Sequence, residues 1–494
     1  MNAPFYPIVY VRGYAATQGE INATVDDPFY GFNVGSTHIR VGAQGEPVPF
    51  FFESPLVRLM SEHGYVDAFH GPAQALGQAA PNADRWRTVW IFRYYDPTAN
   101  TFSWKPNRLT IEDAAKQLRE LIAQVLEQTG APMVHLVAHS MGGLICRSLL
   151  QKIYPEAKED PKKFVSRLFT YATPHGGIQL RSGLGFLERV RDFFGPFDSD
   201  TFGPNRMYAF LTPGKTPKTK APSSFDPRTP GDAFDVDRVF CAVGTNAGDY
   251  DVAAGLSSAS VGPQSDGLVQ IDAAYVLGAH RAYVHRCHSG RYGIVNSEEA
   301  FQNLERFLFG TIQAVISLQG LVKLPPPKEK SYQLDVQVAV RGLPVFMNER
   351  TRPHFCPIVL NDFDKLSPGK PVDLFTQFLN AGRSASGDGT CRFAITFKLY
   401  EFGVIEGKVD YTRALHGLPN WYDTLLVDVK LEEGAPPTLT AWWTAPEPDR
   451  QVDPKLKKIS QGGWMALIPL PSGIAQTLLG TDASLKIEAY DWTN

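Results

Sequence analysis

One serine of this chain stands in a turn of small residues, where its hydroxyl could act as a nucleophile. Residues 138–142 read Ala-His-Ser-Met-Gly, with a short apolar run before them and an amphipathic run after them. A strand that feeds a helix through such a turn exposes the serine oxygen and aims the next amide at the same reacting centre. The pattern departs from the common Gly-x-Ser-x-Gly only at Ala138, which is still small. Ser140 is therefore the candidate nucleophile, and the alternative is an ordinary strand–helix turn that contains a serine.

A serine hydroxyl needs a general base, and the base needs an acid that orients it. In this architecture the acid and the histidine follow the serine along the chain. Asp266 lies in a Ser-Asp-Gly turn after the penultimate predicted strand, and His288 comes directly after the last one. Loops just beyond the carboxyl ends of strands can reach such a serine, so Asp266 and His288 are the candidate acid and base.

Other residues could fill these two roles, since the chain has eleven histidines. His285 falls inside the last strand pattern, and His280 precedes that strand. His139 adjoins the serine but would point away from it, and His175 precedes the acid in sequence. The alternative acids are Asp249, Asp251 and Asp272.

The negative charge that develops on the reacting carbonyl oxygen also needs donors. The first predicted strand, residues 8–11, ends in the glycine turn Gly13-Tyr14. Serine hydrolases of this type place a second oxyanion donor at such a turn. The candidate donors are therefore the backbone amides of Tyr14 and Met141. Taken alone, the Gly13-Tyr14 turn would be interpreted as an ordinary end of a strand. The presence of Ser140 is what makes it a candidate for an oxyanion donor.

The elements that must position these residues alternate between buried strands and amphipathic helices. Residues 110–129 carry apolar side chains at helical spacing and predict a long helix. Apolar runs predict further strands at 89–92, 168–172, 239–244 and 282–287. This order predicts an α/β fold with a mostly parallel sheet, right-handed crossovers and flanking helices. Two segments rich in glycine, proline and polar residues, about 16–85 and 178–235, are predicted to be cap or lid insertions.

The last third of the chain has a different character. Residues 323–330 form a proline-rich linker, and beyond it a short stretch near 372–379 is the only helical candidate. Polar and apolar residues alternate with period two in four runs, at 334–340, 393–402, 425–431 and 484–490. We therefore predict a catalytic domain over 1–322 and an all-β, sandwich-like domain over 331–494.

Composition argues against several other functions. The 494 residues include 48 basic and 51 acidic side chains without a basic block, which argues against a nucleic-acid partner. Five scattered cysteines predict neither a disulfide framework nor a zinc site, and no metal or cofactor is expected. The N-terminus lacks a cationic, apolar leader and no run is long enough to span a membrane, so a cytoplasmic location is expected, with leaderless export left open.

Five short motifs together resemble the α/β-hydrolase superfamily and, more narrowly, bacterial lipases and esterases. They are Gly13-Tyr14, residues 138–143, residues 173–177, residues 265–269 and residues 287–289. The resemblance implies Ser140 as nucleophile, Asp266 as acid and His288 as base. Two departures matter. Arg12 stands where such lipases usually have histidine, and Ser289-Gly290-Arg291 lacks the aspartate of their calcium site, so no calcium is expected.

The resemblance implies hydrolysis of a carboxylic ester through an acyl-enzyme, with an acyl ester or a lipid as substrate. The same residues could also serve a phospholipase or an acyltransferase. A further alternative is a leaderless effector whose β domain contacts a membrane or a partner, and the last is an inactive scaffold. The sequence predicts no oligomeric state.

Overall fold

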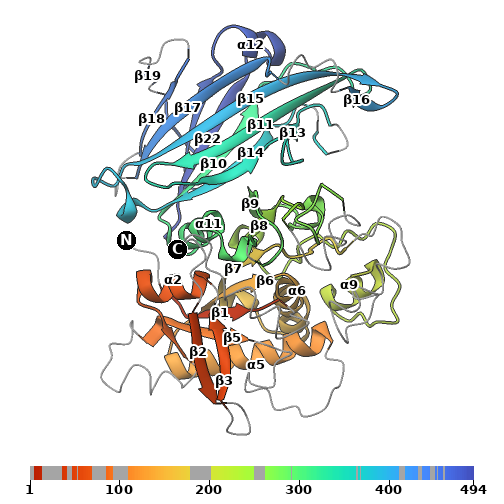
Figure 1. Ribbon diagram of the computed structural model, residues 1–494, viewed down its shortest axis with the longest axis vertical. Coiled ribbons are helices and arrows are strands. Elements are labelled where there is room, and N and C mark those ends of the chain that lie inside the picture. The colour runs from red at the N-terminus through yellow and green to blue at the C-terminus, as the bar shows by residue number, and fades with distance from the viewer. Residues whose placement is uncertain are drawn as a thin grey trace. The chain divides into compact units, whose positions relative to one another are not determined.

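The computed structural model describes most of the chain and divides it into two compact units, Phe5–Phe301 and Gln302–Asn494 (Figure 1). The described residues are 5–13, 36–41, 47–52, 54–68, 85–92, 110–178, 202–249, 262–290, 292–362, 365–367, 369–410, 418–431, 437–445, 451–452, 454–459 and 462–493. Among them, no helix combines the length and the apolar character needed to cross a membrane.

A seven-stranded sheet forms the centre of the first unit, and its strands pair in parallel throughout. In spatial order the strands are β4 (Val66–Asp67), β5 (Thr88–Phe92), β1 (Ile8–Val11), β6 (Val134–His139), β7 (Val165–Tyr171), β8 (Val239–Gly244) and β9 (His280–Val284). Every residue of β1, β6 and β8 is buried, as expected for parallel strands covered on both faces. The predicted α/β fold is confirmed.

Amphipathic helices connect these strands. Helix α5 (Ile111–Thr129) begins at Thr110, whose hydroxyl accepts a hydrogen bond from the Asp113 amide, and ends at Gly130 with φ of 68°. Its buried side chains recur at helical spacing, which explains why the sequence predicts it well. The other helices are α2 (Ser54–His63), α6 (Met141–Ser148), α7 (Tyr154–Glu156), α9 (Pro204–Leu211) and α11 (Glu298–Phe309). A π-helical turn, Leu149–Ile153, joins α6 to α7.

The first predicted insertion, about 16–85, contains more structure than its composition indicates. A separate hairpin is formed by β2 (Ser36–Val41) and β3 (Pro47–Phe52). The short strand β4 adds to the central sheet beside β5, although a two-residue strand leaves no periodic pattern in the sequence.

The second predicted insertion, about 178–235, is tied to the unit by two buried cations. Arg147 donates to the carbonyls of Pro227 and Thr229 at 2.8 and 2.9 Å. Lys152 donates to the carbonyls of Ala209 and Lys215 at 2.7 and 2.8 Å. Residues 202–235 are therefore fixed by side chains from α6 and the π-helical turn, while residues 179–201 of this insertion lie outside the described residues.

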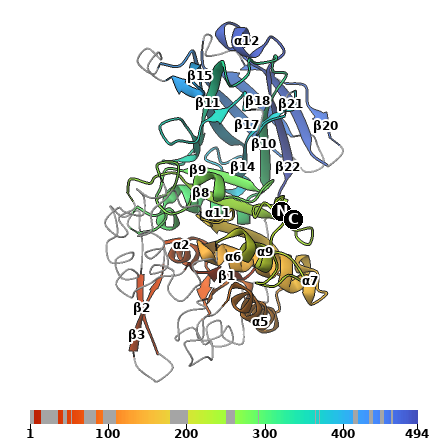
Figure 2. The same ribbon diagram turned by 90° about the vertical axis from the view of Figure 1, so that its right-hand side faces the viewer.

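The second unit consists of two antiparallel sheets that share one apolar core (Figure 2). One sheet has the order β14 (Val372–Leu379), β10 (Ile312–Gln319), β22 (Ser484–Asp491), β21 (Trp464–Pro469) and β20 (Lys457–Lys458). The other has the order β12 (Phe346–Arg350), β11 (Lys330–Val340), β15 (Cys391–Ile405), β17 (Trp421–Lys430), β18 (Thr438–Trp443) and β19 (Gln451–Val452), with β13 (Ile358–Val359) and β16 (Lys408–Asp410) at its sides. A short helix, α12 (Ile474–Leu479), precedes β22. Burial alternates along β15 and β17, as in a sandwich.

The boundary between the units differs from the predicted one at 322. Strand β10 precedes the proline-rich linker, yet it pairs with β14 and β22 of the second unit, and the division falls within α11. The stretch 372–379, a helical candidate in the sequence, is the strand β14. Both differences have one cause, because the strand partners of β10 and β14 lie far away along the chain and local periodicity does not report them.

The pKa of a buried carboxyl in β11 makes the stability of the second unit depend on pH. Asp335 is 3 % exposed, and burial raises its pKa to about 6, although its Oδ1 accepts a hydrogen bond from the Arg352 amide at 2.7 Å. Because the folded pKa lies above the ordinary value of 3.8, this group favours folding most at low pH, and that contribution is lost as pH rises through about 6.

Asp335→Asn should therefore stabilise the protein above pH 6 by at most about 3 kcal/mol and change little near pH 4, because asparagine stays neutral and keeps the acceptor. Urea unfolding followed by tryptophan fluorescence at the two pH values measures this. Asp373→Asn, at an exposed position of β14, is the matched control. Parallel pH profiles for the wild type and Asp335→Asn would contradict the prediction.

Candidate active site

Ser140 occupies a sharp turn between β6 and α6, as the sequence predicts. Its φ of 52° and ψ of −127° lie in a region that residues with a side chain rarely adopt. Three hydrogen bonds hold this backbone. The Ser140 amide donates to the Tyr171 carbonyl at 2.9 Å, and the Ser140 carbonyl accepts from the Thr173 hydroxyl and the Gly143 amide at 2.9 and 3.0 Å. Strand β7 and the turn after it therefore fix the serine in place.

Glycines allow the neighbouring backbone to approach this turn. A Cβ on Gly142 would overlap the Val11 carbonyl at the end of β1, and a Cβ on Gly143 would overlap the Thr173 side chain. A Cβ on Gly13 would lie 2.8 Å from His139 Nδ1 and 3.1 Å from the Ser140 Cβ. The end of β1 thus passes directly beside Ser140, which needs glycine on both sides of the contact.

The three residues predicted as nucleophile, base and acid form one hydrogen-bonded chain. His288 Nε2 lies 3.0 Å from Ser140 Oγ, and His288 Nδ1 lies 2.9 Å from Asp266 Oδ2. All three are buried: Ser140 is 3 % exposed, His288 1 % and Asp266 0 %. Because an ionised carboxylate only accepts, this arrangement places the ring proton on Nδ1, so that Nε2 accepts from the Ser140 hydroxyl.

The turn around Asp266 is built to hold an ionised carboxylate in one orientation. Its Oδ1 accepts from the amides of Leu268 and Val269 at 3.0 and 2.7 Å, which leaves Oδ2 for His288. The His288 amide in turn donates to the Asp266 carbonyl at 2.9 Å. Charge-assisted bonds from amides compensate the buried charge, so the turn supplies an anion where the imidazole needs one.

His139 has a contact that the sequence does not predict. Its Nε2 lies 3.1 Å from the His288 carbonyl, and the two rings are 5.2 Å apart between centroids. Adjacent residues of one turn therefore contact both the side chain and the backbone of His288. Thr173, which holds the Ser140 carbonyl, is a second contributor whose role becomes visible only in the structure; its presence in the motif of residues 173–177 was the available signal.

The competing histidines lie elsewhere. His285 is exposed after β9, with Nδ1 3.4 Å from the Thr245 hydroxyl. His280 begins β9, where burial lowers its pKa to about 4. His175 is fully buried with Nε2 3.1 Å from the Thr170 hydroxyl, and burial, followed by the nearby Arg147, lowers its pKa well below the usual value.

The alternative acids are also placed by the structure. Asp249 is exposed and accepts from Asn246 Nδ2 at 2.7 Å. The Asp272 carbonyl accepts from Arg228 at 3.0 Å. Asp251 lies outside the described residues.

Of the two predicted oxyanion donors, Met141 is among the described residues and Tyr14 is not. Met141 is buried and begins α6, so its amide belongs to the unpaired first turn of that helix. Tyr14 lies outside the described residues. Arg12, the departure from the lipase pattern, is 5 % exposed, and its amide donates to the Phe92 carbonyl at 3.3 Å. The part of the chain that the structure describes holds no group of three or more His, Cys, Asp or Glu side chains that could bind a metal.

A parallel sheet with a strand–serine turn–helix at its centre, and an acid and a histidine after later strands, defines an α/β hydrolase. A family model described as "alpha/beta hydrolase of unknown function (DUF900)" matches residues 58–174, which include the Ser140 turn. The chain thus has the α/β-hydrolase fold, and the resemblance to the superfamily seen in the motifs is confirmed. No curated protein matches the chain.

Several solved structures are similar to this chain at low identity. The Bacillus licheniformis lipase BlEst2 is 15 % identical, with 62 % of this chain and 92 % of that chain covered and a TM-score of 0.33. The phospholipase PlaB from Legionella pneumophila is 14 % identical, with 81 % and 89 % covered and a TM-score of 0.34. A Listeria innocua gene product, lin2722, is 12 % identical, with 61 % and 93 % covered and a TM-score of 0.27. At these scores the likenesses carry no inference about activity.

Gly142→Ala should destabilise the first unit by about 1–3 kcal/mol, because the added methyl group forces β1 away from α6. It should also lower activity, since the end of β1 adjoins Ser140. Urea unfolding followed by circular dichroism measures the stability. Gly248→Ala is the matched control, because that glycine is exposed and a Cβ there meets Asn246 Oδ1 at an ordinary 3.4 Å. Equal stability of the two variants would contradict the close approach.

Proposed function

We propose that the protein is a serine hydrolase that cleaves carboxylic esters through an acyl-enzyme. One observation carries the proposal: His288 lies within hydrogen-bond distance of both Ser140 Oγ and Asp266, at 3.0 and 2.9 Å. A serine alone is a weak nucleophile, and this continuous chain provides the base and the orienting acid that it needs.

In the first half of the reaction, Ser140 Oγ attacks the ester carbonyl carbon while His288 Nε2 takes the hydroxyl proton. The tetrahedral intermediate then collapses, the bond to the leaving oxygen breaks, and His288 returns the proton to the departing alcohol. In the second half, water attacks the acyl-serine with His288 again as base, and the acid is released. Asp266 stays ionised and stabilises the imidazolium in both halves.

The oxyanion of each tetrahedral intermediate needs donors that are already in place. The Met141 amide at the start of α6 is the first proposed donor, and the Tyr14 amide is the second. A donor of this kind contributes about 3 kcal/mol to transition-state stabilisation. The positive end of α6 favours the same charge.

The proposed substrates are acyl esters, including lipids. Acyl transfer would use the same residues, with an acceptor alcohol in place of water in the second half. Product analysis with a candidate acceptor present separates the two reactions, because only transfer yields a new ester.

Labelling with a fluorophosphonate tests the nucleophile directly. The reagent should modify Ser140 and no other serine, because among the serines that the structure describes Ser140 alone contacts a histidine ring. Mass spectrometry of the digested protein locates the adduct. The Ser140→Ala variant is the control. Modification at another serine, or none in folded protein, would overturn the proposal.

The base is tested by two substitutions of the same kind. His288→Ala should lower kcat for a p-nitrophenyl ester by roughly four orders of magnitude or more, because the proton acceptor is lost. His285→Ala, three positions earlier and exposed, should retain most of the activity. The opposite pattern would reassign the base to His285.

A further inference from the structure

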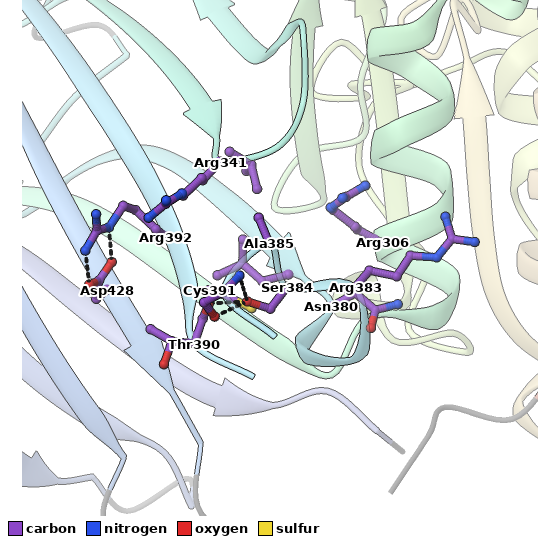
Figure 3. A pocket seen from close by; sticks show the side chains of 13 residues that line it. Arg306, Arg341, Asn380, Arg383, Ser384, Ala385, Thr390, Cys391, Arg392 and Asp428 are labelled. Carbon is purple, nitrogen blue, oxygen red and sulfur yellow. Dashed lines mark hydrogen bonds and ion pairs between the residues drawn. The ribbon is translucent and has the colours of Figure 1, made fainter. Parts of the chain in front are cut away.

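The second unit contains a cavity that the proposed hydrolysis does not use. Its volume is about 50 Å³. It is lined by the C-terminal part of α11, the end of β11, the loop after β14, the start of β15 and Asp428 of β17. Four arginines line it, together with a loop that carries Ser384 and Thr390 (Figure 3). The arginines are Arg306, Arg341, Arg383 and Arg392.

Two carboxylates compensate only part of this positive charge. Arg392 forms a bidentate ion pair with Asp428, with nitrogen–oxygen distances of 2.6 and 2.7 Å. The buried Glu305 is shared, since it lies 2.6 Å from Arg383 and 3.4 Å from Arg306. Arg306, Arg383 and Arg392 thus each have a carboxylate beside them, whereas Arg341 has none among the described residues.

Arg341 carries the positive charge that these carboxylates do not pair. This residue follows β11 and is exposed, and among the described residues its guanidinium has no ion-pair partner. Its backbone is fixed, because the Arg341 amide donates to the Arg392 carbonyl at 2.9 Å. In Figure 3 the Arg392–Asp428 pair lies on one side of the cavity and Arg306 and Arg383 on the other.

An acidic side chain, Asp388, also lies on the lining loop, where its hydrogen bonds are made within that loop. Asp388 accepts from the Thr390 amide and hydroxyl at 2.9 and 3.0 Å, and it is also in the field of Lys430. The loop hydroxyls are occupied too, since Ser384 Oγ donates to the Thr390 carbonyl. The guanidinium groups are therefore the donors that the cavity offers to a ligand.

Positive groups held close together favour an anion between them, and although Arg306 is only 5 % exposed, Arg341 and Arg383 are exposed and accessible to a ligand. The planar fork of arginine matches the oxygens of a phosphate group. A cavity of about 50 Å³ holds about three or four waters, which is the space that one phosphate group needs.

We propose that this cavity binds a phosphate group, either of a soluble phosphate ester or of an anionic lipid headgroup. The site is separate from Ser140, so it stands or falls independently of the proposed hydrolysis. Arg341 contributes the free guanidinium, and Arg306, Arg383 and Arg392 provide the surrounding positive field.

Titration of the full-length Ser140→Ala protein with inorganic phosphate, at ionic strength held constant with chloride, tests the site by calorimetry. Saturable binding should appear, and Arg341→Gln should weaken it about tenfold or more, since a hydrogen bond between charged groups is lost. Lys408→Gln removes the same charge at an exposed position of β16 and should leave the affinity unchanged. Circular dichroism checks that both variants are folded.

Vesicle sedimentation identifies the source of the phosphate group. Phosphatidylcholine vesicles with and without phosphatidic acid are mixed with the same three proteins. Binding that needs both phosphatidic acid and Arg341 assigns a lipid headgroup, while phosphate binding without vesicle binding assigns a soluble phosphate ester. Absence of binding to both probes, or equal binding by Arg341→Gln and Lys408→Gln, would overturn the proposal.

Discussion

The backbone of Ser140 imposes the constraint on which the rest of the first unit depends. Its φ of 52° is unfavourable for a residue with a side chain, so the turn persists only because its surroundings hold it. The Tyr171 carbonyl, the Thr173 hydroxyl and the packing of β1 against Gly142 supply that support. A parallel sheet is suited to this task, because neighbouring strands end at the same edge and their ends can brace one turn.

The residues of the candidate site were predictable because each lies in a short local pattern. A strand, a small-residue turn and a helix mark Ser140, while Asp266 and His288 each follow a strand, in the order that an α/β hydrolase requires. Parallel strands bring such positions to one edge, so the sequence alone could anticipate the hydrogen-bonded chain that the structure displays. The contact between His139 and the His288 carbonyl could not be anticipated, because it depends on the path of a loop.

The segments that escaped prediction depend on partners distant in sequence. Strand β10 lies before the proline-rich linker but belongs with β22, near the end of the chain, so composition placed the boundary too late. Strand β14 has the periodicity of a short helix and becomes a strand because β10 offers it a free edge. Residues 202–235 are rich in proline and polar groups, yet Arg147 and Lys152 hold them in place through hydrogen bonds to their backbone carbonyls.

His139 and Ser140 are consecutive, and together they contact His288 at its carbonyl and its ring. Two residues joined by one peptide bond thus provide the proposed nucleophile and a hydrogen bond to the backbone of its base. Because the two contacts come from these adjacent residues, a change in the path of the loop at His288 would alter both of them together. The position of the base relative to the nucleophile is thus set in part by a backbone contact from the residue next to the nucleophile.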